Sequence, residues 1–168
     1  GFIGRVKKDQ LGAIFTHDIK SVGTYFQTPP ALDGPSTARC LIFVTPDGER
    51  TMCTYLGASV QLEPEDLELS IVKEANVLYL EGYLWDNPAA KRAFLAAAEA
   101  ARSSKRKVAL SLSDSFCVDR HRESFIDLVK KNIDILFANE SEIISLFQCP
   151  DFETAIKEVK DYCDVIAL

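Results

Sequence analysis

The sequence predicts an α/β fold, with a mostly parallel sheet flanked by helices and a small β lid contributed by the first third. Strands alternate with amphipathic helices from residue 76 onward, and a strong turn signal joins two β-rich segments before residue 60. The content of hydrophobic residues is 47 % over 168 residues, which is enough for one ordinary core. Strands that alternate with helices need right-handed crossovers, which make neighbouring strands parallel.

The first third is expected to form a β-hairpin at 38–56. Two segments rich in β-branched and aromatic residues flank the turn signal PDGE at 46–49. Because strand side chains alternate between faces, Arg50, Met52 and Leu56 should share one face. A cation beside apolar groups suits a lid over a ligand that is both apolar and anionic. The alternative for Arg50 is an ordinary solvated hairpin residue.

The remaining elements are expected in regular alternation after residue 76. The expected strands are 76–80, 108–113, 134–138 and 165–168, and the expected helices are 88–102, 120–131, 141–147 and 152–163. Asn87 should cap the first of these helices, with Pro88 at its first position. Phe125, Leu128 and Val129 recur at the spacing of one helix face, which supports the second.

Asn139 and Glu142 follow the strand expected at 134–138 directly. The N-x-x-E spacing is that of a capping box, in which each side chain satisfies a backbone N–H at a helix start. Ligands of open parallel sheets, however, bind outside the carboxyl ends of strands, and helix N-termini attract phosphate. An amide and a carboxylate can also hold Mg²⁺ through its waters. Capping and ligand binding are compatible, so both interpretations stay open.

Glu81, Gly82 and Tyr83 follow the strand expected at 76–80, again at a carboxyl end. One interpretation is a loop that contains a small residue. In the other, Glu81 accepts ligand hydroxyl groups while Gly82 permits a close approach.

Composition argues against several classes of function. A net charge of −6 does not favour a nucleic-acid or anionic-membrane partner, and no apolar stretch approaches the roughly 20 residues of a membrane span. The five cysteines are widely spaced without C-x-x-C, which favours free thiols in a reducing cytoplasm over disulfides or zinc. His17 and His121 are isolated, so neither indicates zinc or a catalytic triad. Walker and Rossmann phosphate loops are both missing from the sequence.

Together these segments resemble the ribokinase-like (PfkB) family of sugar and nucleoside kinases, and within it the adenosine-kinase-like branch. The segments similar to family motifs are GFIGRVKKDQLG at 1–12, DGERTM at 47–52, LEGY at 80–83 and NESE at 139–142. The segments similar to the adenosine-kinase-like branch are RTMCTYLGA at 50–58, LSLSDSF at 110–116 and DILF at 134–137. Lys7 stands where the first motif has a glycine.

The resemblance implies transfer of the γ-phosphoryl group of ATP to a primary hydroxyl of a sugar or nucleoside, with Mg²⁺. An adenosine or ribose-like acceptor is favoured. Asn139 and Glu142 would then organise the ATP phosphates and Mg²⁺, the latter through water. Arg50 would come over the site with the lid and neutralise the transferring phosphate.

The resemblance also implies an acceptor pocket. Met52 and Leu56 would contact the apolar part of the acceptor, such as a nucleobase, while Glu81 and Tyr83 would border the pocket. The hairpin is also a surface through which two copies could form a homodimer.

Two family segments have no counterpart in the sequence: the glycine-rich D-T-x-G-A-G-D, which carries the base aspartate, and G-G-x-x-x-N-x-A. We therefore expect an incomplete kinase domain over 1–168, truncated at both ends and inactive by itself. Its lid strands would lie within about 12–60 and its α/β core over 76–168. The alternatives are a non-catalytic ligand-binding or regulatory protein of the same fold, or an unrelated nucleotide-binding α/β domain.

Overall fold

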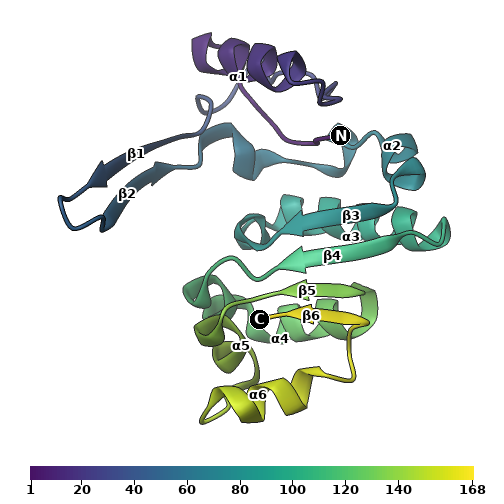
Figure 1. Ribbon diagram of the computed structural model, residues 1–168. Coiled ribbons are helices and arrows are strands. Elements are labelled where there is room, and N and C mark those ends of the chain that lie inside the picture. The colour runs from purple at the N-terminus through teal and green to yellow at the C-terminus, as the bar shows by residue number, and fades with distance from the viewer. The chain divides into compact units, whose positions relative to one another are not determined.

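The computed structural model describes all 168 residues and confirms the α/β fold (Figure 1). The chain divides into two compact units, Gly1–Glu68 and Leu69–Leu168. The first contains a two-stranded antiparallel sheet and the second a four-stranded sheet.

The first unit begins with an extended segment and a helix. Its elements are α1 (Gln10–Ser21), β1 (Arg39–Val44), β2 (Arg50–Tyr55) and the 3-10 helices η1 (Gly57–Gln61) and η2 (Pro64–Asp66). Phe2, Phe15 and Phe26 pack together with ring centroids 5.6–5.8 Å apart. Phe26 is the most deeply buried of the three, so this aromatic cluster anchors α1 to the extended segments on either side of it.

The sequence analysis did not predict α1, whose start depends on contacts distant in the chain. The Asp9 carboxylate accepts hydrogen bonds from Gly12 N (2.8 Å), Thr37 Oγ1 (2.7 Å) and Thr37 N (2.9 Å). These bonds, from the Thr37 backbone first, hold the pKa of Asp9 below its usual value. A Cβ on Gly12 would lie 2.0 Å from the Lys7 carbonyl oxygen, so a larger residue would push α1 away. Asp9 and Gly12 of the first motif therefore have structural roles.

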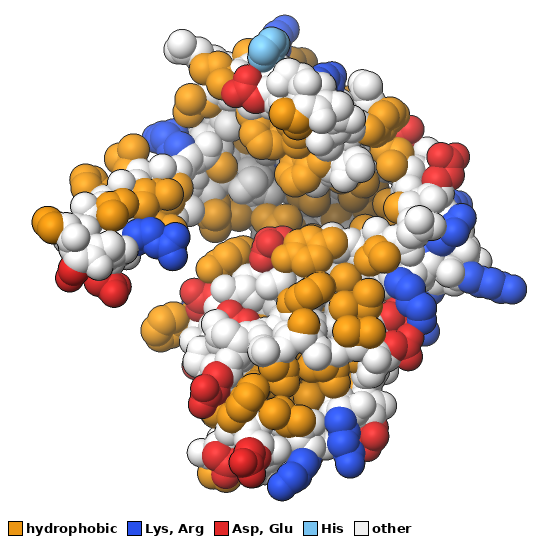
Figure 2. Space-filling model, in the orientation of Figure 1, with side chains coloured by type: hydrophobic (Ala, Val, Ile, Leu, Met, Phe, Trp, Pro, Cys, Tyr) orange, Lys and Arg blue, Asp and Glu red, His pale blue; other side chains and the backbone are white.

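The predicted hairpin is confirmed. β1 and β2 pair antiparallel, and Thr45 N donates to Glu49 O (3.0 Å) to close the turn. Every residue of both strands is exposed, and Figure 2 shows apolar side chains along the hairpin. The strand prediction was wrong at Leu56, which lies beyond β2 with helical angles (φ −73°, ψ −28°) at the start of η1. Strand alternation therefore relates Arg50 to Met52 and does not extend to Leu56.

The second unit contains the predicted alternation. Its elements are α2 (Leu69–Glu74), β3 (Val77–Glu81), the 3-10 helix η3 (Gly82–Asp86), α3 (Pro88–Ser103), β4 (Lys107–Ser111), α4 (Ser115–Asn132), β5 (Ile135–Phe137), α5 (Glu140–Phe147), α6 (Phe152–Val159) and β6 (Val165–Ala167). The strands pair in the order β3-β4-β5-β6, all parallel. Asn87 caps α3 through Ala89 N (2.8 Å), as predicted.

The core of the second unit lies between the sheet and its helices. Trp85 stacks on Phe125 of α4 with ring centroids 5.5 Å apart. Phe94 of α3 packs against Trp85 with ring centroids 5.9 Å apart. The Trp85 indole N–H donates to Ser124 Oγ (2.8 Å), so its buried polar atom is satisfied. This packing fixes η3, and hence the segment that follows β3, against α3 and α4.

Helix α4 begins five residues before the predicted start at Arg120. The polar residues 119–123 interrupt the apolar spacing, so the first turn of α4 could not be recognised from the sequence pattern. Burial of Cys117 and Val118 stabilises this first turn. The Asp114 carboxylate caps this turn through Phe116 N (2.6 Å) and Cys117 N (3.3 Å). The helix is kinked at His121, whose backbone is not helical (φ −129°, ψ 22°).

No helix combines the length and apolar character needed to cross a bilayer. All five cysteines are free thiols. No three His, Cys, Asp or Glu side chains are grouped as direct metal ligands.

Candidate functional site

The candidate site lies at the carboxyl edge of the parallel sheet, where β3, β4 and β5 lead into η3, α4 and α5 (Figure 1). Ligands of open α/β sheets bind at this edge. The polar side chains at the three strand ends are those of Glu81, Tyr83, Ser113, Asp114, Asn139 and Glu142.

Asn139 and Glu142 form a complete capping box. Asn139 Oδ1 accepts from Glu142 N (2.9 Å), and the two Glu142 oxygens accept from Asn139 N (3.0 Å) and Asn139 Nδ2 (2.9 Å). Glu142 is only 6 % exposed, whereas Asn139 is exposed. The capping interpretation is therefore confirmed, and the ligand role of the pair stays a prediction.

The pair fits a hydrated divalent cation. Each Glu142 oxygen uses one acceptor position on Asn139 and has another available. An open cavity of about 690 Å³ adjoins the helix start. It is lined by Asp119, Asn139, Glu140, Ser141, Ile144 and Ser145. The charged side chains of this lining are acidic, and Glu142 is not one of the lining residues. Carboxylate and amide oxygens are donors that Mg²⁺ prefers.

Glu81 is held at the end of β3 by two hydroxyl groups. Tyr79 Oη donates to Glu81 Oε2 (3.1 Å), and Ser113 Oγ donates to Glu81 Oε1. Tyr79 precedes it on the same strand, whereas Ser113 follows the neighbouring strand β4. The exposed carboxylate is thus fixed from two sides before any ligand binds.

Tyr83 links Glu81 to the capping box electrostatically. Partial burial, and then the negative charges of Asp114, Glu81 and Glu142, raise the pKa of the Tyr83 phenol. The phenol is therefore protonated near neutral pH and available as a hydrogen-bond donor. The fold thus brings Glu142, at the start of α5, to the same edge as Glu81 and Tyr83, which follow one another at the end of β3.

Gly82 serves the packing of the strand ends. A Cβ at this position would lie 2.5 Å from Ser111 O and 2.8 Å from Leu112 O. The close approach that Gly82 permits is therefore to the backbone that follows β4.

The predicted lid residues belong to the first unit. Met52 is 60 % and Leu56 is 39 % exposed, and Arg50 is exposed as well. Their closure over the sheet edge stays a prediction.

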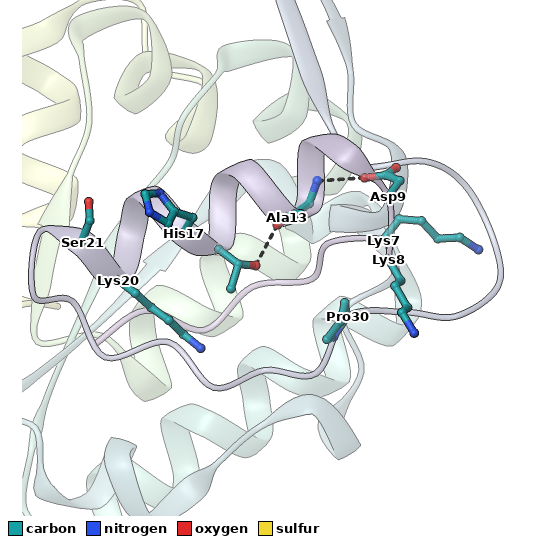
Figure 3. Close-up of a pocket in the computed structure, with 10 residues that line it drawn as sticks. Lys7, Lys8, Asp9, Ala13, His17, Lys20, Ser21 and Pro30 are labelled. Carbon is teal, nitrogen blue, oxygen red and sulfur yellow. Dashed lines mark hydrogen bonds between the residues drawn. The ribbon is translucent and has the colours of Figure 1, made fainter.

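A second open cavity of about 640 Å³ lies within the first unit, beside α1 (Figure 3). Lys7, Lys8 and Lys20 line it together with Pro30, and none of the predicted site residues does. Lys7 Nζ donates a hydrogen bond to the Leu32 carbonyl oxygen (2.7 Å).

The sequence analysis did not single out Ser113 and Tyr79, and it assigned Asp114 no role in the site. The rule applied to Asn139, that polar residues directly after a parallel strand deserve attention, would have found Asp114. It would have missed Ser113, because the strand was expected to run to residue 113 whereas β4 ends at Ser111. Tyr79 gave no such signal, because it lies within β3.

Comparisons with known proteins agree with the fold. The family model described as pfkB family carbohydrate kinase matches residues 1–166. An adenosine kinase from Sinorhizobium meliloti is 49 % identical with a TM-score of 0.92, over 97 % of this chain and 50 % of that chain. A probable sugar kinase protein from Rhizobium etli CFN 42 is 51 % identical with a TM-score of 0.92, over 98 % of this chain and 51 % of that chain.

A more distant structure, adenosine kinase from Anopheles gambiae, shares the fold at 23 % identity and a TM-score of 0.80, over 93 % of this chain and 48 % of that chain. The search of curated proteins gave no match. The chain spans about half the length of the solved structures it matches. Because the family match extends over nearly the whole chain, this protein belongs to the PfkB family of carbohydrate kinases.

Proposed function

We propose that the protein, at its natural length, transfers the γ-phosphoryl group of ATP to a primary hydroxyl of a sugar or nucleoside. The observation that carries this proposal is the PfkB match over residues 1–166. The polar groups at the carboxyl edge of the sheet support it, because phosphoryl transfer depends mainly on positioning and electrostatic stabilisation.

In this proposal, Asn139 and Glu142 hold the ATP phosphates and Mg²⁺ at the start of α5. Bound Mg²⁺ would neutralise charge on the phosphoryl oxygens. The capping box holds the Glu142 carboxylate in place, so its remaining acceptor positions are oriented before a ligand arrives. Asn139 Oδ1 accepts from Glu142 N and from Ser141 Oγ. Outer-sphere binding through water suits a site where the carboxylate is nearly buried.

The hairpin closes over the acceptor and brings Arg50 to the transferring phosphate. Met52 and Leu56 then cover the apolar part of the acceptor, with Leu56 reaching it from the start of η1 rather than from β2. Closure of such a lid would exclude water from the transfer. The exposure of all three side chains in the first unit supports this role.

Glu81 and Tyr83 border the acceptor pocket, as a hydrogen-bond acceptor and a hydrogen-bond donor. We favour adenosine or a ribose-like acceptor. The two relatives at about half identity are described as an adenosine kinase and a probable sugar kinase, so both acceptor classes belong in the test.

We also propose a cytoplasmic location, supported by five free thiols. A homodimer could form through the hairpin, where Leu41, Ile42, Phe43 and Val44 are 55–64 % exposed. Sedimentation of the wild-type protein and of Phe43→Ser would test this interface. A monomeric wild-type protein would exclude it.

The decisive experiment is an ATP-to-ADP assay of the full-length protein with adenosine, ribose and fructose. Acceptor-dependent turnover that requires Mg²⁺ is expected, at rates of about 1–100 s⁻¹. Acceptor binding without turnover would instead support the non-catalytic alternative. The 168-residue chain assayed alone should be inactive, because no glycine follows Gly82 to build a glycine-rich anion hole.

A further inference from the structure

The chain makes an unusual turn between β4 and α4. Ser113 has a left-handed backbone (φ 69°), although it is not glycine. Asp114 N donates to Leu112 O (2.8 Å), which closes a three-residue γ-turn around Ser113. The γ-turn with positive φ at its centre is the rare and strained form. Strain of this kind persists where the surroundings impose it, and it concentrates at functional sites.

The surroundings impose this turn from both sides. Leu112 N is bound to Phe137 O of β5 (3.1 Å), and Asp114 caps α4. A serine in this turn projects its hydroxyl back across the strand end toward Glu81, to which it donates. Ser113 Oγ also lies 3.3 Å from the Ser111 carbonyl oxygen, so its hydroxyl has an alternative acceptor nearby.

We propose that Ser113, assisted by Tyr79, is a positioning residue that orients the Glu81 carboxylate toward an acceptor hydroxyl. The inference rests on the proposed function, because it assigns Glu81 to the acceptor pocket. An ionised carboxylate has about four acceptor positions. Tyr79 and Ser113 each occupy one, on different oxygens, which leaves one position on each oxygen for the acceptor.

Orientation matters because Glu81 is exposed and a free glutamate side chain can adopt many rotamers. An exposed glutamate loses rotamer freedom when it binds a ligand. Two hydroxyl donors already restrict it, so acceptor binding would order less of the side chain. Removing the Ser113 hydroxyl should therefore weaken acceptor binding while leaving ATP binding unchanged.

Two substitutions separate the hydroxyl from the backbone strain. Ser113→Ala removes the hydroxyl and keeps a Cβ at positive φ, whereas Ser113→Gly removes the hydroxyl and relieves the strain. Ser113→Gly should therefore be the more stable of the two in urea unfolding. Both should raise the KM for the acceptor by the same factor, roughly 5- to 30-fold for one charge-assisted hydrogen bond, with the KM for ATP unchanged. Ser103→Ala, which removes a hydroxyl bound to Ala100 O (2.9 Å) at the end of α3, is the control and should change neither KM.

The test uses the full-length protein, with kinetics and calorimetric titration of adenosine and ribose. In a Glu81→Gln background, Ser113→Gly should have little further effect, since residues that act together are not additive. An unchanged acceptor KM and Kd in Ser113→Gly, or an equal loss in both backgrounds, would overturn the positioning role.

The two proposals fail in different ways. Binding of the acceptor by wild type, without turnover but weakened in Ser113→Gly, would reject the kinase function and keep the positioning role. If wild type turns over the acceptor and Ser113→Gly leaves the acceptor KM and Kd unchanged, the kinase function stands and the positioning role is rejected. If wild type neither binds nor phosphorylates these acceptors, both proposals are wrong.

Discussion

Glu142 offers the sharpest separation of a structural role from a functional one. Its two oxygens accept two different donors of Asn139, at 3.0 and 2.9 Å. Glu142→Gln replaces one acceptor oxygen by an NH₂ group, so the variant retains only one of the two bonds. Loss of one hydrogen bond costs about 0.5–1.5 kcal/mol of unfolding free energy, with some further cost because one Asn139 donor then faces the new NH₂ group.

The turnover of the variant should fall by much more than this stability loss explains. At saturating ATP, Glu142→Gln is expected to lower kcat and to shift the Mg²⁺ concentration at half-maximal rate upward. The measurements are urea unfolding and initial rates at limiting and saturating Mg²⁺, on the full-length protein.

Asn87→Ala is the matched control. It removes the N-cap of α3, a single bond to Ala89 N of 2.8 Å, and caps of this type contribute about 0.5–2 kcal/mol. It should lose a similar amount of stability and keep its Mg²⁺ dependence. If Glu142→Gln matches Asn87→Ala in both stability and kinetics, Glu142 is a helix cap only and the proposed metal role is refuted.

Three further outcomes are expected. Arg50→Ala should lower kcat/KM, whereas Met52→Ala should mainly raise the acceptor KM; an acceptor-bound structure with both side chains in open solvent would contradict the lid. Phe125→Ala should cost about 3–5 kcal/mol in urea unfolding, because its fully buried ring stacks on Trp85, and a loss below about 1 kcal/mol would contradict that packing. Because the pKa of Asp9 is depressed, its contribution to stability is present above the ordinary value of 3.8 and is lost as pH falls through the lower folded-state pKa. Asp9→Asn should therefore show a weaker acid dependence of stability than wild type, measured by unfolding from neutral to strongly acidic pH.

The alternating elements of the second unit were predictable because their signals are local. Asn87 and Pro88 mark the start of α3, and the apolar spacing of Phe125, Leu128 and Val129 marks the middle of α4. Helix α1 gave a weaker signal, since Gly12 and several β-branched or aromatic residues lower its intrinsic propensity. Its stability comes from the Phe26 cluster and from the bonds of Asp9 to Thr37, which join residues distant in sequence.

The candidate site likewise contains one contact that the sequence predicts and one that only the fold reveals. Asn139 and Glu142 are three residues apart, so their contact follows from sequence spacing alone. The contact between Ser113 and Glu81 joins residues 32 apart and needs a backbone turn that serine does not favour. Pattern analysis assigns serine no such angle, so this half of the site required the fold.

Motif residues of this chain differ in how far their structural role accounts for them. Gly12 and Gly82 are accounted for by backbone oxygens that would lie within 2.5 Å of an added Cβ, and Asp9 by the three donors it accepts from. The capping box accounts for Glu142 only in part, because acceptor positions remain on both of its oxygens.

Glu81 is the motif residue that packing explains least. It stabilises no helix start and its side chain is exposed, yet two hydroxyl groups hold it in place. One of those hydroxyl groups belongs to Ser113, which has a positive φ and is not one of the buried core residues. A functional role explains such an arrangement better than a structural one, so substitutions at Glu81 and Ser113 should separate activity from stability more cleanly than substitutions at Gly12 and Gly82.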